Sequence, residues 1–273
     1  MGDRVACGRY VLKVSLIITT YNSPDALRKV MESTLCQIRL PDEVLIADDG
    51  SDEKTARVTE DYIRAASFPV FHIWQEHRGF RAARIRNEAI KRTTGDYIVL
   101  LDGDCIANRH FISDHVKLAE KGYFIQGKRV HVNRNVVGWF SHDHANSARS
   151  LIRMAFSLSI SNVHHILRLS FFPPVRNERL NGIKSCNMSF FREDILAVNG
   201  FNEEFMEWGN EDSELACRFF KYGLIKKVHP FMAICFHLWH PTNKTGREET
   251  RKLLEATIAS KEYFCEHGLT KKA

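Results

Sequence analysis

The strongest constraint on the fold of this chain lies near its middle, where the apolar run Ile98 to Leu101 leads directly into Asp102, Gly103 and Asp104. A short continuous apolar run is typical of a strand that is buried on both faces of a parallel sheet. Open α/β sheets bind ligands at the carboxyl ends of such strands, and carboxylates there suit Mg²⁺ or Mn²⁺ bound together with substrate phosphates. Asp and Gly are also common turn formers, so a simple turn is the competing interpretation.

The first half of the chain alternates between strand and helix patterns. Strands are predicted over residues 14–20, 43–47, 70–74 and 98–102. Helices are predicted between them, over residues 24–35, 52–66 and 81–94. This alternation predicts an α/β fold with a mostly parallel, doubly wound sheet and right-handed crossovers.

The second half of the chain is less regular. We expect strands over residues 123–132, 185–191 and 227–238. We expect one helix to begin near Glu211 and a final helix over residues 247–267. Residues 133–180 fit no clear pattern, so we treat them as a variable segment within a single fused domain with halves 1–131 and 132–273.

The composition says more about the cellular compartment of the protein than about its chemistry. The seven cysteines are scattered without a C-x-x-C pair, which argues against a disulfide framework or a structural zinc site and favours a reducing compartment. Residues 1–10 lack an apolar signal core, and no stretch is apolar over the roughly 18 residues that a membrane span needs. We therefore expect a cytoplasmic protein. Its net charge of +6 suits phosphate-bearing ligands, anionic membranes or nucleic acid equally well.

Polar residues follow the predicted strands at the points where they end. Thr19 and Tyr21 follow the first strand, Asp49 follows the second, and the D-G-D carboxylates follow the fourth. Because the carboxyl ends of neighbouring parallel strands share one edge, these side chains are expected to line one crevice. A hydroxyl, an aromatic ring and a carboxylate there could bind a nucleobase and a ribose.

These motifs, taken in order, resemble the inverting family 2 glycosyltransferases of the GT-A fold. The resemblance rests on I-I-T-T-Y-N, A-D-D-G-S, the arginine-containing helix after Gly79 and D-G-D, and it covers about residues 13–131. In the second half, W-G-N-E-D at residues 208–212 is similar to the W-G-G-E-D segment of galactosyltransferases and chondroitin-polymerase-like enzymes, with Asn210 in place of the second glycine. The resemblance implies that residues 1–131 bind a nucleotide-sugar. It assigns the acceptor and the catalytic base to a smaller, mixed half, residues 132–273.

The resemblance also implies the residues that bind a UDP-sugar donor. Thr19, Tyr21 and Asp49 would hold the uracil. The other implied donor contacts are Arg81 near the uridine or diphosphate, Asp102 at the ribose, and Trp208 and Asn187. Asn187 would touch the donor sugar, although a structural role as a strand amide is equally compatible with its sequence context.

The metal and the catalytic base follow from the same resemblance. Asp104 would ligate Mn²⁺ or Mg²⁺, with His237, His240 or both completing the protein ligands. Asp212 would be the general base that deprotonates the acceptor hydroxyl, and Glu211 would orient the acceptor. Sugar transfer needs both a cation at the departing diphosphate and a base on the opposite side. Acids in the first turn of a helix also complement its dipole, which is the structural alternative for Glu211 and Asp212.

The predicted activity is therefore transfer of a hexose or N-acetylhexosamine from a UDP-sugar to a glycan or glycolipid hydroxyl, in lipopolysaccharide, capsule or other surface-polysaccharide assembly. A nucleotidyltransferase is the first alternative, but residues 19–25 contain no Gly, Lys or Arg for the expected phosphate loop. A non-catalytic carbohydrate-binding module is the second. A nucleic-acid partner is not expected, because the motif-bearing edge is acidic.

Residues 144–177 contain no Asp or Glu but carry four arginines, Arg149, Arg153, Arg168 and Arg176. Apolar residues recur among them at helical spacing, from Ile152 to residue 167. These residues form either core-packing helices or an acceptor-site lid, or else a basic amphipathic surface that contacts an anionic membrane at its cytoplasmic face.

Overall fold

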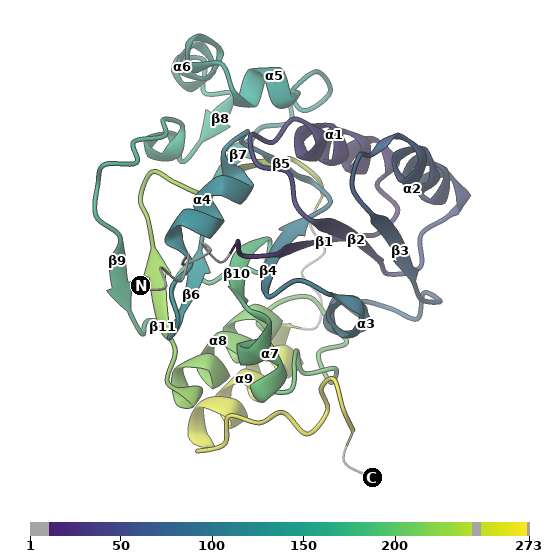
Figure 1. Cartoon of the computed structure of the whole chain (residues 1–273), viewed down its shortest axis with the longest axis vertical. Helices are drawn as coiled ribbons and strands as arrows, with labels where there is room; N and C mark the ends of the chain where they lie inside the picture. The colour runs from purple at the N-terminus through teal and green to yellow at the C-terminus, as the bar shows by residue number, and fades with distance from the viewer. Residues whose placement is uncertain (1–10, 242–246, 272–273) are drawn as a thin grey trace, which may run out of the picture.

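The computed structural model describes residues 11–241 and 247–271. We expected no signal segment in residues 1–10, and these residues lie outside the described part of the chain. In the described part the chain forms one large sheet, one small sheet and helices on both faces of the large sheet (Figure 1). None of the described helices combines the length and the apolarity needed to cross a membrane.

The large sheet confirms the predicted parallel half. Its strands, in spatial order, are β3 (Val70–Trp74), β2 (Glu43–Asp48), β1 (Val14–Thr20), β4 (Tyr97–Asp102), β10 (Asn187–Phe191), β6 (Tyr123–Gln126), β11 (Ile225–Val228) and β9 (Val175–Asn177). The four strands from β3 to β4 are mutually parallel, whereas β10 is antiparallel to both of its neighbours. The second half of the sheet is therefore mixed.

Helices cover both faces of this sheet because its central strands are apolar on both sides. In β1, Leu16 and Ile18 belong to one buried cluster, while Ile17 between them belongs to a second. The first cluster includes residues of α1 (Pro24–Leu35), α2 (Glu53–Ala65) and α4 (Phe111–Leu118). The second includes residues of α3 (Ala82–Arg92), α7 (Arg192–Ala197) and α8 (Glu211–Tyr222), on the opposite face (Figure 1).

A small second sheet lies beside the large one, and it corrects two of the predicted strands. Its order is β5 (Cys105–Ala107), β12 (Ile234–Leu238), β7 (Lys128–Val132) and β8 (Ile160–Ser161). Residues 123–132 are thus two strands, β6 and β7, and residues 227–238 contain the end of β11 and all of β12. At Gly127 the chain leaves one sheet for the other, and a Cβ there would lie 1.9 Å from the Asn187 side chain, so only glycine fits this corner.

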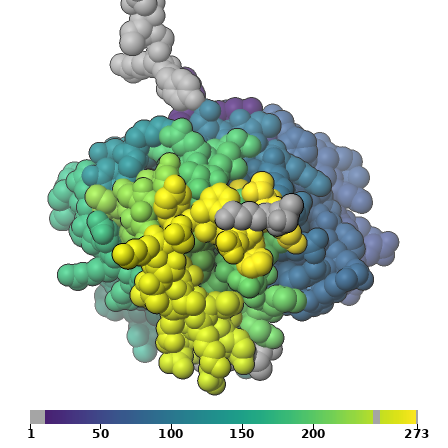
Figure 2. Space-filling view, turned by 90° about the horizontal axis from the view of Figure 1, so that it is seen from below, coloured from purple at the N-terminus to yellow at the C-terminus, as the bar shows by residue number. Residues whose placement is uncertain are grey.

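The C-terminal helix is shorter than predicted. Helix α9 (Arg247–Ala259) ends eight residues early and packs against α8. The chain after α9 then crosses the lower face of the molecule, where Figure 2 shows it in yellow over the green second half. Asn199 holds this segment by hydrogen bonds to Cys265 and Thr270, and Leu269 is buried in the second cluster.

The variable segment, residues 133–180, is divided into several short elements. It contains α5 (His142–Ala145), α6 (Ala148–Phe156), β8, the short 3-10 helix η1 (Val163–His165) and β9. Two of its four arginines are engaged elsewhere, because Arg168 pairs with Asp114 at 2.7 Å and Arg176 pairs with Glu120 at 3.4 Å. Only the arginines of α6 remain for the proposed basic surface.

Candidate active site

The segments predicted to line one crevice meet at the carboxyl ends of β1, β2 and β4. Thr19 pairs with Asp102 across β1 and β4, and Thr20 pairs with Asp48 across β1 and β2. The backbone N–H of Gly103 donates to the Thr19 carbonyl at 2.7 Å, which holds the D-G-D turn against the end of β1. The parallel register thus brings three segments that are distant in sequence to one edge.

An aromatic platform stands at one end of this edge. Tyr21 stacks on His77 with ring centroids 4.3 Å apart and planes 13° apart, and Tyr21 is 44% exposed. Gly50 has a φ of +88°, and a Cβ there would lie 2.3 Å from the backbone nitrogen of His77. Glycine is therefore required where the turn passes His77. His77 was not anticipated from the sequence, because no local pattern marks it.

Asp49 lies behind this platform and is buried. Its two carboxylate oxygens accept hydrogen bonds from the Gln75 amide at 2.6 Å and from the Arg81 backbone at 2.8 Å. Burial raises the pKa of Asp49 despite these bonds. Because a carboxylate has about four lone-pair sites, it can still accept from a ligand. The Arg81 guanidinium, by contrast, donates to the Glu76 carbonyl and lines a cavity of about 460 Å³ with Trp74 and Arg84.

Arg86 connects the edge at the ends of β1 and β4 to the second half of the chain. Its guanidinium donates to Thr19 Oγ1 at 3.1 Å, to Asp102 Oδ1 at 3.2 Å and to Glu211 Oε1 at 3.2 Å. Burial by itself would lower the pKa of Arg86, but Asp102 and Glu211 together raise it. No sequence motif gave Arg86 a role of its own. A basic residue in the crevice-facing helix α3 was the only available signal.

The carboxylates around Arg86 hold protons more tightly than free acids do. Burial, opposed by the charge of Arg86 and assisted by that of Asp104, raises the pKa of Asp102 to about 6. Burial also raises the pKa of Glu211, helped by the charge of Asp212. Glu211 and Asp212 begin α8, so the end of the W-G-N-E-D segment faces the D-G-D turn through Arg86.

The left-handed backbone before α8 explains the W-G-N-E-D spacing. Gly209 has a φ of +105° and Asn210 a φ of 71°, a conformation that Asn adopts more readily than most residues. Asn210 also donates to Thr250 at 3.2 Å, which ties the segment to α9. Trp208 is 42% exposed, and the Arg247 guanidinium lies 5.1 Å from its ring centroid.

The Asp212 carboxylate lies near a lysine. Its Oδ1 accepts from the Ser213 backbone at 2.7 Å, and its Oδ2 lies 3.7 Å from Lys184 Nζ. One carboxylate oxygen is thus used within the helix, and the other is held near a single positive charge. That second oxygen is the one available to accept a proton.

Asp104, His237 and His240 form the only group of potential metal ligands found in the described part of the chain. One ligand atom from each lies within 4.8 Å of the others. Asp104 Oδ2 is 3.1 Å from His240 Nε2 and 3.5 Å from His237 Nε2. The structure thus brings both candidate histidines to the D-G-D carboxylate.

The chemistry of these three residues fits a divalent cation. Burial lowers the pKa of His237 to about 4, so its imidazole is neutral and has a free lone pair for a metal. The hydrogen bond to Asp104 raises the pKa of His240 to about 9, so a cation would replace this proton. His240 Nδ1 bonds the Pro241 carbonyl at 2.9 Å, which directs Nε2 towards Asp104 as metal-ligating histidines require.

Asn187 has the structural role that the sequence left open. Its amide donates to the carbonyls of Lys128 and Ala233 at 3.0 and 2.8 Å, and its oxygen bonds His115 at 3.0 Å. The side chain is 1% exposed and joins the two sheets at the Gly127 corner. A contact with the donor sugar would have to break these bonds, so the structure favours the role of a strand amide for Asn187 over that of a donor contact.

Comparison with known families assigns this chain to a class of enzyme. A model of glycosyl transferase family 2 matches residues 15–196, and a model described as the N-terminal domain of galactosyltransferase matches residues 168–241. The chain therefore belongs to glycosyl transferase family 2, and it is a glycosyltransferase. This membership decides against the nucleotidyltransferase and the non-catalytic binding module.

Curated relatives support the same family. The hyaluronan synthase of Pasteurella multocida is 28% identical over 88% of this chain, and the chondroitin synthase of Escherichia coli is 23% identical over 91%. This chain spans only 26% and 38% of those two proteins, respectively. The uncharacterized glycosyltransferase YfnE of Bacillus subtilis is 34% identical over 93% of this chain and 70% of its own length.

Solved structures show the same GT-A fold. TarS 1-349 of S. aureus in complex with UDP aligns with a TM-score of 0.64 at 18% identity, over 92% of this chain and 65% of that one. A mannosyltransferase of Pyrobaculum calidifontis in complex with GDP-Man and Mn²⁺ aligns with a TM-score of 0.57, also at 18% identity, over 91% of this chain and 62% of that one. At this level of identity the comparison supports the fold alone.

Proposed function

We propose that this glycosyltransferase transfers a hexose or N-acetylhexosamine from a UDP-sugar to the hydroxyl of a glycan or glycolipid acceptor, with metal dependence and inversion at the anomeric carbon. The observation that carries the proposal is Arg86, which holds Thr19 and Asp102 of the donor edge against Glu211 of the acceptor half. The proposed donor edge and the proposed base are thereby parts of one site.

The donor side is proposed to bind UDP through the residues that follow β1, β2 and β4. Tyr21, supported by His77, offers a flat surface for the uracil, and Asp49 offers an acceptor for its N–H. Thr19 and Asp102 lie side by side near the ribose position. The UDP and UDP-GlcNAc complexes of TarS agree with this donor class.

The metal is proposed to be Mn²⁺ or Mg²⁺, held by Asp104, His237 and His240. These residues supply one carboxylate oxygen and two imidazole nitrogens, and the donor diphosphate would complete the coordination. When bound, the cation stabilises the negative charge of the departing UDP.

Asp212 is proposed as the general base. Its carboxylate accepts the proton of the acceptor hydroxyl while the hydroxyl oxygen attacks the anomeric carbon and the bond to UDP breaks. Attack opposite the leaving group converts an α-linked donor into a β-linked product. Glu211, fixed by Arg86, is proposed to orient the acceptor beside this base.

The biological setting is proposed from the named relatives. Hyaluronan and chondroitin synthases are polysaccharide synthases by name, and this chain spans only part of each. Assembly of a surface polysaccharide, lipopolysaccharide or capsule at the cytoplasmic face of a membrane fits this pattern. In α6, the exposed Arg149 and Arg153 lie beside Phe156, which is 87% exposed, and would give a peripheral membrane contact.

A donor panel tests the proposal. Thermal unfolding is measured with Mn²⁺ and each of UDP-glucose, UDP-galactose, UDP-GlcNAc and UDP-GalNAc, and UDP release is measured in parallel. A ligand that binds only the folded chain raises its melting temperature, by an amount that follows its affinity. GDP-mannose is the control donor. A larger shift with GDP-mannose than with every UDP-sugar would overturn the uridine assignment.

A further inference from the structure

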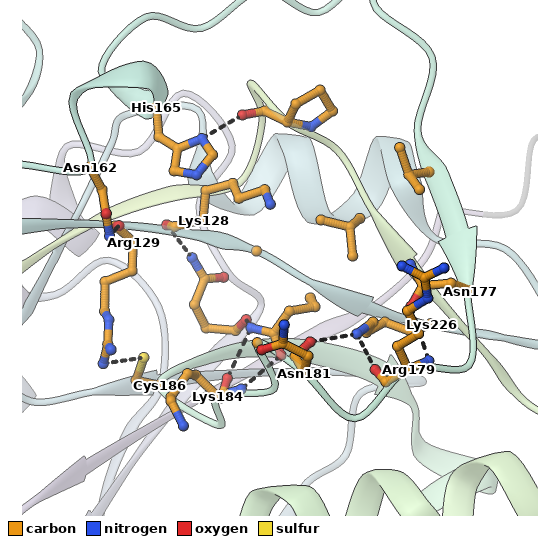
Figure 3. Close-up of a pocket in the computed structure, with 17 residues that line it drawn as sticks. Lys128, Arg129, Asn162, His165, Asn177, Arg179, Asn181, Lys184, Cys186 and Lys226 are labelled. Atoms are coloured by element: carbon orange, nitrogen blue, oxygen red, sulfur yellow. Dashed lines mark hydrogen bonds between the residues drawn. The ribbon is translucent and has the colours of Figure 1, made fainter.

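A basic cavity of about 510 Å³ lies next to the proposed base, at the corner between β6 and β7 (Figure 3). The cavity is bounded by the Gly127 corner, by residues 162–165 and by the loop that leads from β9 to β10. Its volume falls within the usual range of small-molecule sites. The cationic residues that line it are Lys128, Arg129, Arg179, Lys184 and Lys226.

No acidic residue lines this cavity among the residues that the structure describes. The other polar lining comes from asparagine and glutamine amides and from His165, whose pKa burial lowers to about 4, so that it is neutral. Figure 3 shows Lys128 and Arg129 on one wall and Arg179 and Lys226 on another. The cavity therefore gathers positive charge without an internal counter-charge.

In two lysines that line the cavity, this arrangement disfavours the charged form of the amine. Burial lowers the pKa of Lys128, and no described carboxylate offsets it. Burial also lowers the pKa of Lys226, and Lys128 and Arg179 lower it further. The Lys226 ammonium donates to the carbonyls of Arg179 and Asn181, which fixes it in the wall. An anion in the cavity would stabilise these buried ammonium groups, because a nearby opposite charge and charge-assisted hydrogen bonds favour the charged form of an amine.

The cavity adjoins the catalytic carboxylate through one side chain. Lys184 lines the cavity, and its ammonium lies 3.7 Å from Asp212 Oδ2. The proposed uracil platform, Tyr21 stacked on His77, follows β1 and β3 of the parallel half, whereas the cavity lies at the β6–β7 corner, on the other side of β4 and β10. A ligand in the cavity would thus approach the base from the acceptor half of the molecule.

We propose that this cavity binds an anionic group of the acceptor, a sugar carboxylate or a phosphate, so that the acceptor is an acidic glycan or glycan phosphate. The inference rests on the proposed function, because it takes Asp212 as the base that receives the acceptor hydroxyl. The anion is held by Lys128, Arg179 and Lys226, and the neighbouring sugar hydroxyl then lies near Asp212.

The test uses acceptor-like probes without any donor. Isothermal titration measures the affinity of a uronate-containing tetrasaccharide, of its carboxyl-reduced neutral counterpart, and of a sugar 1-phosphate. The test variant Lys128→Gln/Arg179→Gln removes two charges from the cavity. The control variant Lys54→Gln/Arg57→Gln removes the same charges from the exposed face of α2. Melting temperatures verify folding, and Arg179→Gln alone, in an exposed loop, serves if the double variant unfolds.

We expect at least one anionic probe to bind the wild type more tightly than the neutral tetrasaccharide, and the test variant to lose about tenfold of that affinity. The control variant should bind as the wild type does. Preference for the tetrasaccharide would identify a carboxylate, and preference for the sugar 1-phosphate would identify a phosphate.

Three outcomes would overturn the inference: equal affinity for charged and neutral probes, no loss in the test variant, or displacement of the anionic probe by UDP, which would mark the cavity as part of the donor site. UDP release from the donor panel separates the two proposals. If UDP is released and the cavity shows no preference for anions, the inference alone fails. If no UDP-sugar binds or is cleaved, the proposed function fails.

Discussion

Arg86 Nη1 lies 3.2 Å from Glu211 Oε1, although the two residues are 125 positions apart in the chain. Their side chains are 5% and 9% exposed, so this is a buried ion pair. It fixes the first turn of α8 against the crevice formed by the parallel strands. The pair therefore links the parallel strands, where the nucleotide is proposed to bind, to the helix that carries the proposed base.

Removing Arg86 should destabilise the fold strongly. Arg86→Ala leaves the buried carboxylates of Asp102 and Glu211 without their shared cation, and breaking a buried pair in this way typically costs about 3–5 kcal/mol. The free energy of unfolding, measured with urea, tests this. Arg57→Ala breaks an exposed pair with Glu53 and should cost less than about 1 kcal/mol. Equal losses in the two variants would contradict a structural role for the Arg86 network.

The metal ligands can be tested by titration. Asp104→Ala, His237→Ala and His240→Ala should each weaken Mn²⁺ binding, measured by electron paramagnetic resonance in the presence of UDP. EDTA should abolish sugar transfer, and excess Mn²⁺ should restore it. His164→Ala, an exposed histidine elsewhere, is the control. Full activity in EDTA, or in the Asp104 variant, would show that this cluster is not a metal site.

Asp212→Asn should separate chemistry from donor binding. Loss of a general base costs on the order of 10²–10⁴-fold in turnover, while UDP affinity should stay nearly unchanged because Asp212 belongs to the proposed acceptor half. Asp143→Asn, at a carboxylate whose side chain is 83% exposed, is the matched control. NMR coupling constants of the wild-type product should show a β linkage. A retained configuration would rule out direct displacement with Asp212 as its base.

The raised pKa of Asp194 should make the free energy of unfolding depend on pH. Burial raises its pKa from 3.8 to about 6, and its Oδ2 has no hydrogen-bond partner among the described residues. Between these two pH values the folded chain holds a proton that the unfolded chain has lost, so stability falls as the pH rises through this window. Asp194→Asn should be more stable than wild type by about 1 kcal/mol at pH 7, after allowance for solvent screening.

This advantage of Asp194→Asn should disappear below about pH 4, where Asp194 is protonated in both states. Thermal unfolding from pH 4 to pH 7 measures it. Asp61→Asn, at an exposed position in α2, should show no such trend. An advantage that is independent of pH would indicate that the effect does not come from the charge.

Membrane contact through α6 can be measured with vesicles. Sedimentation with anionic liposomes should fall when Arg149 and Arg153 are replaced by Glu, because each arginine contributes about 1 kcal/mol near an anionic surface. Binding should also weaken at high salt, which screens this field. Phe156→Ser should reduce binding at all salt concentrations. Equal sedimentation with neutral and anionic vesicles, or none with either, would argue for a packing role of α6.

Much of the fold followed from local pattern. The runs in β1, β2 and β4 are apolar enough to be buried on both faces, β3 extends them as a half-exposed edge strand, and the intervening helices have clear apolar faces. The parallel half was therefore predictable with its edge of polar residues. The errors occurred at Gly127 and between β11 and β12. There a continuous run of β-forming residues crosses from one sheet to another, and periodicity contains no information about which sheet a strand joins.

The sequence by itself determined the family, the acidic edge and the candidate ligands, because each depends on residue types at short spacing. Only the tertiary structure showed that His237 and His240 both lie close to Asp104. It also showed that the Asn187 amide is hydrogen-bonded to backbone carbonyls and that the His77 ring stacks on Tyr21. The hydrogen bonds of Arg86 to both halves of the chain, and the basic cavity beside Lys184, were likewise visible only in the tertiary structure. These features join residues distant in the chain, and their burial and partners are set by how the two sheets pack, which no local spacing encodes.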